Sequence, residues 1–316
     1  MDQGIRVEHL SKKLGKFKLE DIHFSMDRGY VLGLIGRNGA GKTTLLNTIM
    51  GVWKPDEGSI GIEGYDRVTE EVRAKDEIAF VLDESLLPVS MTPSSAGKLF
   101  QTVYSRFHYE HFKKLCKHFG LPMHRSIRRM SKGMVIKLQI ALAFSRDARL
   151  YIFDEPSAGL DPVFRKEFVD IIFDLIQDGT KTVIFSTHLT DELDRIADYV
   201  LFLEKGKQLL FEQKEELLSH YRLLRGSKDR IEEYGEQIIG KRIAENCSEA
   251  LVRIDAVKEK PLPVTGESHM EKVGAGVSRL DQVGAGKVLI NTEGQLQMVT
   301  PTIEDIMYYF LKGTVA

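Results

Sequence analysis

The chain has 316 residues, of which 42% are hydrophobic and 28% are charged, as in ordinary soluble globular proteins. Its formal net charge of −2 argues against a surface built mainly for nucleic-acid phosphates, so no nucleic-acid partner is expected. No uninterrupted apolar segment approaches the roughly 18 residues of a membrane-spanning helix. The first residues lack the apolar core of a secretion signal, and Cys116 and Cys247 have no partner motif. We therefore expect a soluble, cytoplasmic chain with reduced cysteines.

Apolar or alternating segments in the first 83 residues predict strands, interrupted by a glycine loop and a helix at 43–50. The predicted strands cover residues 5–10, 19–26, 30–36, 58–64 and 78–83. Between about Asp83 and Arg129 the pattern changes to helical spacing, which predicts a helical insertion. The apolar residues expected to pack in its core are Leu99, Val103, Phe107, Phe112, Leu115 and Phe119.

Helices and strands alternate in the next part of the chain. Helices are predicted at 134–145, 164–177 and 191–197, strands at 150–153 and 182–186, and a hairpin over 199–211 that turns at Lys205–Gly206. This alternation predicts an α/β fold with a largely parallel sheet, whose ligands collect at the carboxyl ends of the strands. Asp154, Glu155 and His188 all follow such apolar strands.

The composition changes after about Ser219. Residues 222–247 are highly charged and are expected to be helical, whereas 250–257 and 287–299 are expected to be strands. The glycine-rich stretch between these strands carries VGAG twice, at Val273 and Val283, and is expected to form loops. A closing helix is predicted over 301–313. We therefore expect a small α+β domain over residues 219–316.

The run GRNGAGKTT at Gly36–Thr44 fits the phosphate-loop pattern, between an apolar strand and a helix. Glycines let consecutive backbone N–H groups point at phosphates, and the helix N-terminus adds partial positive charge. Lys42 is expected to hold the β- and γ-phosphates of ATP, and Thr43 to ligate Mg²⁺. The expected nucleotide-binding positions of the loop are Gly36, Asn38, Gly39, Ala40, Gly41, Lys42, Thr43 and Thr44.

Two acids end the strand LYIF. Asp154 is expected to hold Mg²⁺, and Glu155 to act as the general base for an attacking water. His188, which closes FSTH, is expected to sense the γ-phosphate.

Ser131 opens the segment SKGM, where serine is a good helix N-cap and the capped N-terminus also attracts a phosphate. This segment lies 95 residues beyond Gly36, which suggests that it serves a nucleotide held by another copy of the domain.

Together these motifs resemble the ATP-binding cassette (ABC) family of ATPases. The likeness covers about residues 4–218 and implies a P-loop NTPase fold with a helical subdomain at about 84–132. The matched motifs are Walker A (Gly36–Thr43), Walker B with its catalytic glutamate (Leu150–Glu155), the D-loop (Ala158–Asp161) and the switch histidine (His188). The resemblance implies that two cassettes clamp two ATP molecules head to tail.

Three positions depart from the pattern of the family. MSKGM (Met130–Met134) stands where the family usually carries LSGGQ, although Ser131 and Gly133 are kept. Asp83 stands where a glutamine usually senses Mg²⁺ and the membrane partner, and an acid there can still ligate the metal. The aromatic residue that stacks on adenine aligns with Leu14, and Phe17 is expected to substitute for it.

The spellings SKGM, VLDE and the ending PTIEDIMYYFLKG look most like bacterial cassette subunits of the bacitracin-resistance and related peptide or antibiotic export type. We therefore expect an ATPase subunit that drives export of a peptide, antibiotic or lipid-like substrate. Its expected partners are a separate multi-spanning membrane subunit and a second cassette, either a copy or a close paralogue, at the inner face of the membrane. The alternatives are a soluble ABC ATPase acting on ribosomes or DNA, and a regulatory cassette that does not transport.

Overall fold

A computed structural model describes residues 3–157, 159–187, 190–244, 247–254 and 296–313. The chain divides into two compact units. The first comprises Met1–Leu218 and Thr302–Met307, and the second comprises Ser219–Pro301 and Tyr308–Ala316. No helix in these described ranges is long and apolar enough to cross a membrane.

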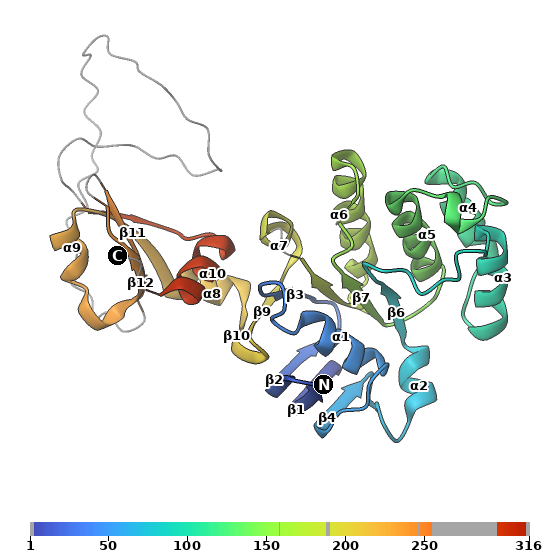
Figure 1. Cartoon of the computed structure of the whole chain (residues 1–316), viewed down its shortest axis with the longest axis horizontal. Helices are drawn as coiled ribbons and strands as arrows, with labels where there is room; N and C mark the ends of the chain where they lie inside the picture. Colours follow the sequence, from blue (N-terminus) through green and yellow to red (C-terminus); the bar gives the residue numbers. More distant parts are fainter. Residues whose placement is uncertain (1–2, 158, 188–189, 245–246, 255–295, 314–316) are drawn as a thin grey trace, which may run out of the picture. The chain divides into compact units, whose positions relative to one another are not determined.

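A ten-stranded sheet forms the centre of the first unit (Figure 1). Its strands are β1 (Gln3–Leu14), β2 (Phe17–Asp27), β3 (Val31–Ile35), β4 (Glu57–Ile62), β5 (Tyr65–Asp66), β6 (Ile78–Val81), β7 (Leu150–Asp154), β8 (Thr182–Ser186), β9 (Tyr199–Glu204) and β10 (Lys207–Gln213). They are ordered β5-β4-β1-β2-β10-β9-β3-β8-β7-β6. The segment from β9 to β6 is parallel throughout, so the predicted α/β fold is confirmed and the carboxyl ends of these strands meet at one edge.

Helices cover this sheet because its central strands are buried along their whole length. The helices are α1 (Lys42–Met50), α2 (Glu71–Asp76), α3 (Pro93–Val103), α4 (Tyr109–His118), α5 (Lys132–Phe144), α6 (Pro162–Ile176), α7 (Thr190–Ile196) and α8 (Lys214–His220). The aromatic ring of Phe168 on α6 meets that of Phe153 on β7 edge to face, with 5.2 Å between centroids. This packing fixes the end of β7, where Asp154 lies.

The insertion between β6 and β7 is helical, and Figure 1 shows α3, α4 and α5 together beyond β6. Phe107, Phe112 and Phe119 are buried in it as expected, but Leu99 and Val103 are exposed. Their predicted core role is wrong because α3 packs through small residues. A methyl group on Gly97 would lie 2.4 Å from the ring of Phe112, so this close approach turns the larger apolar side chains of α3 outward.

The second unit contains a four-stranded antiparallel sheet ordered β12-β13-β11-β14. Its elements are β11 (Tyr221–Gly226), α9 (Lys228–Glu232), β12 (Ile238–Arg242), β13 (Ser248–Arg253), β14 (Gln297–Val299) and the end of α10 (Ile303–Lys312). The helix expected over 222–247 is therefore wrong for most of its length. β11 bonds to β13 on one side and to β14 on the other, and this long-range pairing overrides the local charge pattern. Both VGAG segments lie outside the described residues.

Candidate functional site

An open pocket of about 1040 Å³ lies at the carboxyl edge of the parallel strands. Its lining includes the whole glycine loop from Gly36 to Thr44, together with Phe17, Asp83, Lys132, Glu155, Glu204 and Lys205. The pocket thus brings together residues that lie far apart in the sequence, such as Phe17 and Lys205, which are 188 positions apart. Leu14 is not among its lining residues, whereas Phe17 is.

The glycine loop connects β3 to α1. Its last glycine, Gly41, directly precedes α1 and has a backbone conformation that only glycine accommodates well. Gly41 has φ +112°, and a methyl group there would lie 2.8 Å from the ring of Phe17. The first turn of α1 contains no acidic residue and no side-chain cap bonds to it. Its N–H groups are therefore available to an anion, as the partial positive charge of a helix N-terminus favours.

Lys42 is buried at the bottom of this pocket. Its Nζ donates a hydrogen bond to the carbonyl oxygen of Gly36 at 2.8 Å and lies 3.3 Å from Oε1 of Glu155. The loop thus folds back on its own lysine, which fixes the ammonium group where phosphate oxygens would enter. A phosphate would compete with Glu155 for this charge.

Thr43 and Asp154 lie side by side although 111 residues separate them. The Thr43 hydroxyl donates to Oδ2 of Asp154 at 2.9 Å, and the Ser186 hydroxyl donates to Oδ1 at 2.6 Å. No group of three or more His, Cys, Asp or Glu in the described ranges could hold a metal by itself. One hydroxyl and one carboxylate do fit Mg²⁺ that takes its remaining ligands from phosphates and water.

The backbone turns sharply at Glu155, whose φ is +51°. A left-handed conformation is costly for a residue other than glycine and is concentrated at functional sites. The Glu155 N–H donates to the carbonyl oxygen and the hydroxyl of Ser186, both at 3.1 Å, which holds the turn in place. Sequence reasoning missed Ser186 as a support of both acids, although it belongs to the segment FSTH.

A second buried acid lies behind the site. Glu192 on α7 accepts hydrogen bonds from Ser157 at 2.8 Å and from Thr187 at 3.2 Å, and it lies 3.5 Å from Arg165. Burial raises the pKa of the Glu192 carboxyl above its usual range, although the two hydroxyl donors lower it in part. Glu192 ties the segment after β7 to the segment after β8, and the sequence analysis did not identify it. His188 itself lies outside the described residues.

The raised pKa of Glu192 predicts how the stability of the first unit depends on pH. The folded state binds the proton more tightly than the unfolded state does, so this contribution to stability is complete below the unfolded pKa of about 4.3 and is lost as pH rises through the folded pKa. We expect Glu192→Gln to remove this loss. Its melting temperature relative to wild type should therefore rise as pH increases above the unfolded pKa of about 4.3, while the exposed Glu57→Gln should show no such trend. If the melting temperatures of Glu192→Gln and wild type change with pH in parallel, this prediction is contradicted.

The remaining predicted site residues occupy helix starts or the rim. Ser131 is the N-cap of α5, as predicted, and accepts a hydrogen bond from the N–H of Met134 at 3.2 Å. Asp161 caps α6 in the same way, through the N–H of Phe164 at 2.9 Å, and this bond lowers the pKa of the Asp161 carboxyl. Ser131, Gly133 and Asp161 are not among the residues that line the pocket. Asp83 does line it, with Oδ1 2.6 Å from Nζ of Lys132.

Comparison with known proteins agrees with this geometry. The family model of the ABC transporter matches residues 19–158, and a model of an AAA domain (putative AbiEii toxin, Type IV TA system) matches residues 124–194. The ABC transporter ATP-binding protein NatA of Bacillus subtilis is 32% identical over 195 residues, which cover 60% of this chain and 79% of NatA. The chain belongs to the family of ABC transporter ATP-binding proteins.

Two further Bacillus subtilis members of this family are similar to the chain. The uncharacterized ABC transporter ATP-binding protein YdbJ is 32% identical over 206 residues, which cover 64% of this chain and 67% of YdbJ. The linearmycin resistance ATP-binding protein LnrL is 29% identical over 221 residues, which cover 68% of this chain and 71% of LnrL.

Solved structures show the same fold. An ATP-binding subunit of an ABC transporter superposes with a TM-score of 0.63 and 27% identity, covering 68% of this chain and 92% of that subunit. The ATP-binding cassette MJ0796, solved as a dimer in a post-hydrolysis state with ADP and Pi, gives a TM-score of 0.60 at 20% identity, covering 66% of this chain and 98% of that cassette. This ABC protein therefore has the P-loop NTPase fold of the family, binds nucleotide and is an ATPase.

Proposed function

We propose that this ABC ATPase drives an exporter through a separate membrane subunit, with two cassettes closing around two ATP molecules. The observation that carries the proposal is the convergence of Lys42, Thr43 and Glu155 at one pocket, with Asp154 hydrogen-bonded to Thr43. A lysine, a hydroxyl and a carboxylate are the groups that hold a phosphate–Mg²⁺ pair, and the neighbouring glutamate is placed to activate water.

The residues divide the chemistry among them. Lys42 and the N-terminal N–H groups of α1 hold the phosphates, and Phe17 stacks on the base. Thr43 and Asp154 would hold Mg²⁺, with Asp83 as a further ligand on the rim. The ion would supply positive charge next to the phosphate oxygens. Glu155 removes a proton from the attacking water, and His188 contacts the γ-phosphate.

The second cassette completes the site in this proposal. Ser131, Gly133 and Asp161 do not line their own subunit's pocket, and in this proposal they serve the nucleotide of the other subunit. The N-terminus of α5 has the partial positive charge that a γ-phosphate seeks. The dimeric state of MJ0796, which has the same fold, supports this arrangement.

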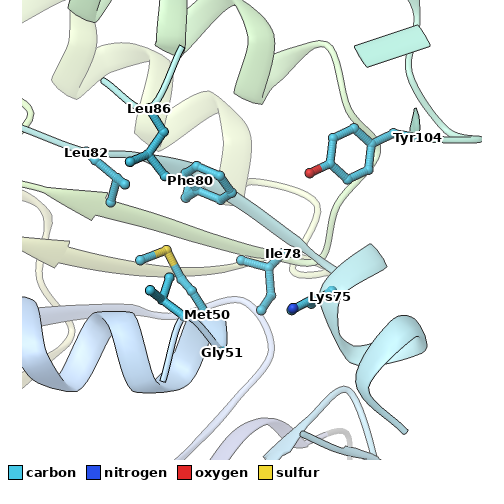
Figure 2. A pocket seen from close by; sticks show the side chains of 9 residues that line it. Met50, Gly51, Lys75, Ile78, Phe80, Leu82, Leu86 and Tyr104 are labelled. Atoms are coloured by element: carbon cyan, nitrogen blue, oxygen red, sulfur yellow. The ribbon is translucent and has the colours of Figure 1, made fainter. Parts of the chain in front are cut away.

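An apolar hollow of about 290 Å³ is the proposed docking site for the membrane subunit. Figure 2 shows Met50 at the end of α1, Phe80 and Leu82 from β6 and its end, and Leu86 around this hollow, with Tyr104 at one side. Leu86 is 70% exposed and Val52, which also lines the hollow, is 56% exposed, so the apolar surface of the hollow extends to residues that a partner could cover. An amphipathic cytoplasmic helix of the membrane subunit would bury this surface.

The relatives guide the choice of substrate. LnrL confers resistance to linearmycin by its name, and the spellings SKGM and VLDE look like the bacitracin-resistance type. We therefore place the protein with exporters of peptides, antibiotics or lipid-like molecules, on the cytoplasmic face of the membrane.

Purification of the tagged protein from native membranes tests this proposal. We expect a multi-spanning membrane protein to co-purify, and Leu86→Glu to reduce its recovery about tenfold or more, because a carboxylate would be buried in an apolar contact. Val72→Glu is the matched control, since Val72 is 83% exposed and does not line the hollow. Recovery of ribosomes or DNA in place of a membrane protein, or equal recovery with Leu86→Glu, would contradict the proposal.

A further inference from the structure

Lys132 connects the start of α5 to the rim of the nucleotide pocket. Its Nζ lies 2.6 Å from Oδ1 of Asp83, which follows β6 and is 49 residues away in the sequence. Both side chains line the pocket that contains the glycine loop. This ion pair therefore attaches the segment Ser131–Met134 to the pocket of its own subunit.

The stem of Lys132 lies over a second segment. A methyl group built on Gly159, whose φ is +99°, would be 3.3 Å from Cδ of Lys132, and one built on Gly133 would be 3.1 Å from the carbonyl oxygen of Gly159. One turn further along α5, Nζ of Lys137 lies 3.6 Å from Oδ2 of Asp161. The first two turns of α5 are thus held against residues 159–161 on one side and against Asp83 on the other.

The strength of the Asp83–Lys132 pair suits a contact that is made and broken. The two side chains are 43% and 56% exposed, and exposed pairs contribute only about 0.2–1 kcal/mol. Such an energy changes an equilibrium by roughly 1.4-fold to 5-fold. A doubly charged cation at the rim, or phosphate oxygens near Lys132, would compete effectively for either partner.

We propose that Lys132 is a positioning residue whose pairing with Asp83 restrains the Ser131–Met134 segment in the nucleotide-free subunit. Arrival of nucleotide and Mg²⁺ draws Asp83 away and frees the segment to face the second subunit. This inference rests on the proposed function for its consequence in the dimer. The restraint itself is a property of the single subunit and is tested there separately.

The first test measures hydrogen exchange of the amides in 130–137 in nucleotide-free monomer. We expect Lys132→Met and Asp83→Asn each to speed exchange about 1.4-fold to fivefold, because each breaks the same pair. The exchange rate of the double variant should equal that of either single variant. In the charge-swapped variant, Asp83→Lys with Lys132→Asp, the exchange rate should return towards the wild-type value. Lys12→Met, which breaks the Lys12–Asp56 pair at 2.8 Å on β1, is the matched control and should leave 130–137 unchanged. Exchange rates in the single variants that equal the wild-type rate would overturn the proposal, and so would single-variant effects that add in the double variant.

The second test follows ATP-dependent dimer formation in a Glu155→Gln background. Lys132→Met should lower the ATP concentration for half-maximal dimer about 1.4-fold to fivefold, whereas Asp83→Asn, which also loses a proposed Mg²⁺ ligand, should lower it less. The double variant should lower it no further than Lys132→Met does. If Lys132→Met weakens dimer formation while Asp83→Asn strengthens it, Lys132 serves the phosphate directly and the proposal fails. If the Glu155→Gln parent forms no dimer with ATP, both the two-cassette function and the release of Ser131–Met134 on nucleotide binding are overturned. The restraint in the single subunit is decided separately, by the hydrogen-exchange rates.

Discussion

Glu155→Gln should lower steady-state ATP hydrolysis by about 100-fold to 10,000-fold, the range expected for loss of a general base. ATP binding should persist, because the amide keeps the shape of the side chain and Lys42 still donates to the carbonyl oxygen of Gly36. With turnover blocked, the ATP-bound dimer should accumulate. Phosphate release measured beside light scattering, with and without ATP, checks both expectations.

The control for this variant is Glu84→Gln, which changes an exposed acid adjacent to Asp83 and should leave hydrolysis unchanged. Near-normal hydrolysis by Glu155→Gln would contradict the assignment of the base. Loss of nucleotide binding in the same variant would mean that the contact between Glu155 and Lys42, at 3.3 Å, holds the pocket open for ATP.

Lys42→Met should weaken ATP binding most strongly of all the single changes. Truncating one partner of a buried, hydrogen-bonded charge pair costs about 2–5 kcal/mol, which is roughly 30-fold or more in affinity. Methionine keeps most of the apolar stem, so the glycine loop and the fold should survive. Titration with a fluorescent ATP analogue, beside a thermal melt, separates lost binding from lost structure.

Lys166→Met on the exposed side of α6 is the matched control for this variant and should bind ATP normally. Binding by Lys42→Met within a few-fold of wild type would show that the N-terminus of α1 and the glycine loop hold the phosphates without the lysine. That outcome would remove Lys42 from the proposed chemistry.

The restraint at Lys132 and the network at Glu192 give the ATPase two ways to connect its segments. Glu192 joins the segment after β7 to the segment after β8 through Ser157 and Thr187, next to the acids at the end of β7. Asp83 and Lys132 join the residue after the end of β6 to the start of α5 at the rim of the pocket. Binding of phosphates in the pocket could therefore affect two segments that the proposed dimer would present to its second subunit. These are the segment after β7 and the start of α5.

Local patterns in the sequence determined the core of the cassette. Short apolar runs predicted β3, β7 and β8, and the glycine loop followed by a helix predicted the anion site at α1, because these elements depend on neighbours only a few residues away. The cap at Ser131 was predictable for the same reason. The sequence also placed Asp154 and Glu155 at the carboxyl end of a strand.

Only the tertiary structure decided which of these residues meet. The contact of Thr43 with Asp154, the support from Ser186 and the pairing of Asp83 with Lys132 all depend on the order of strands in the sheet, which no local pattern encodes. Contacts between residues that are distant in the sequence also explain the errors. β11 is a strand because distant β13 and β14 bond to it, and the larger apolar residues of α3 face outward because Gly97 lets Phe112 approach.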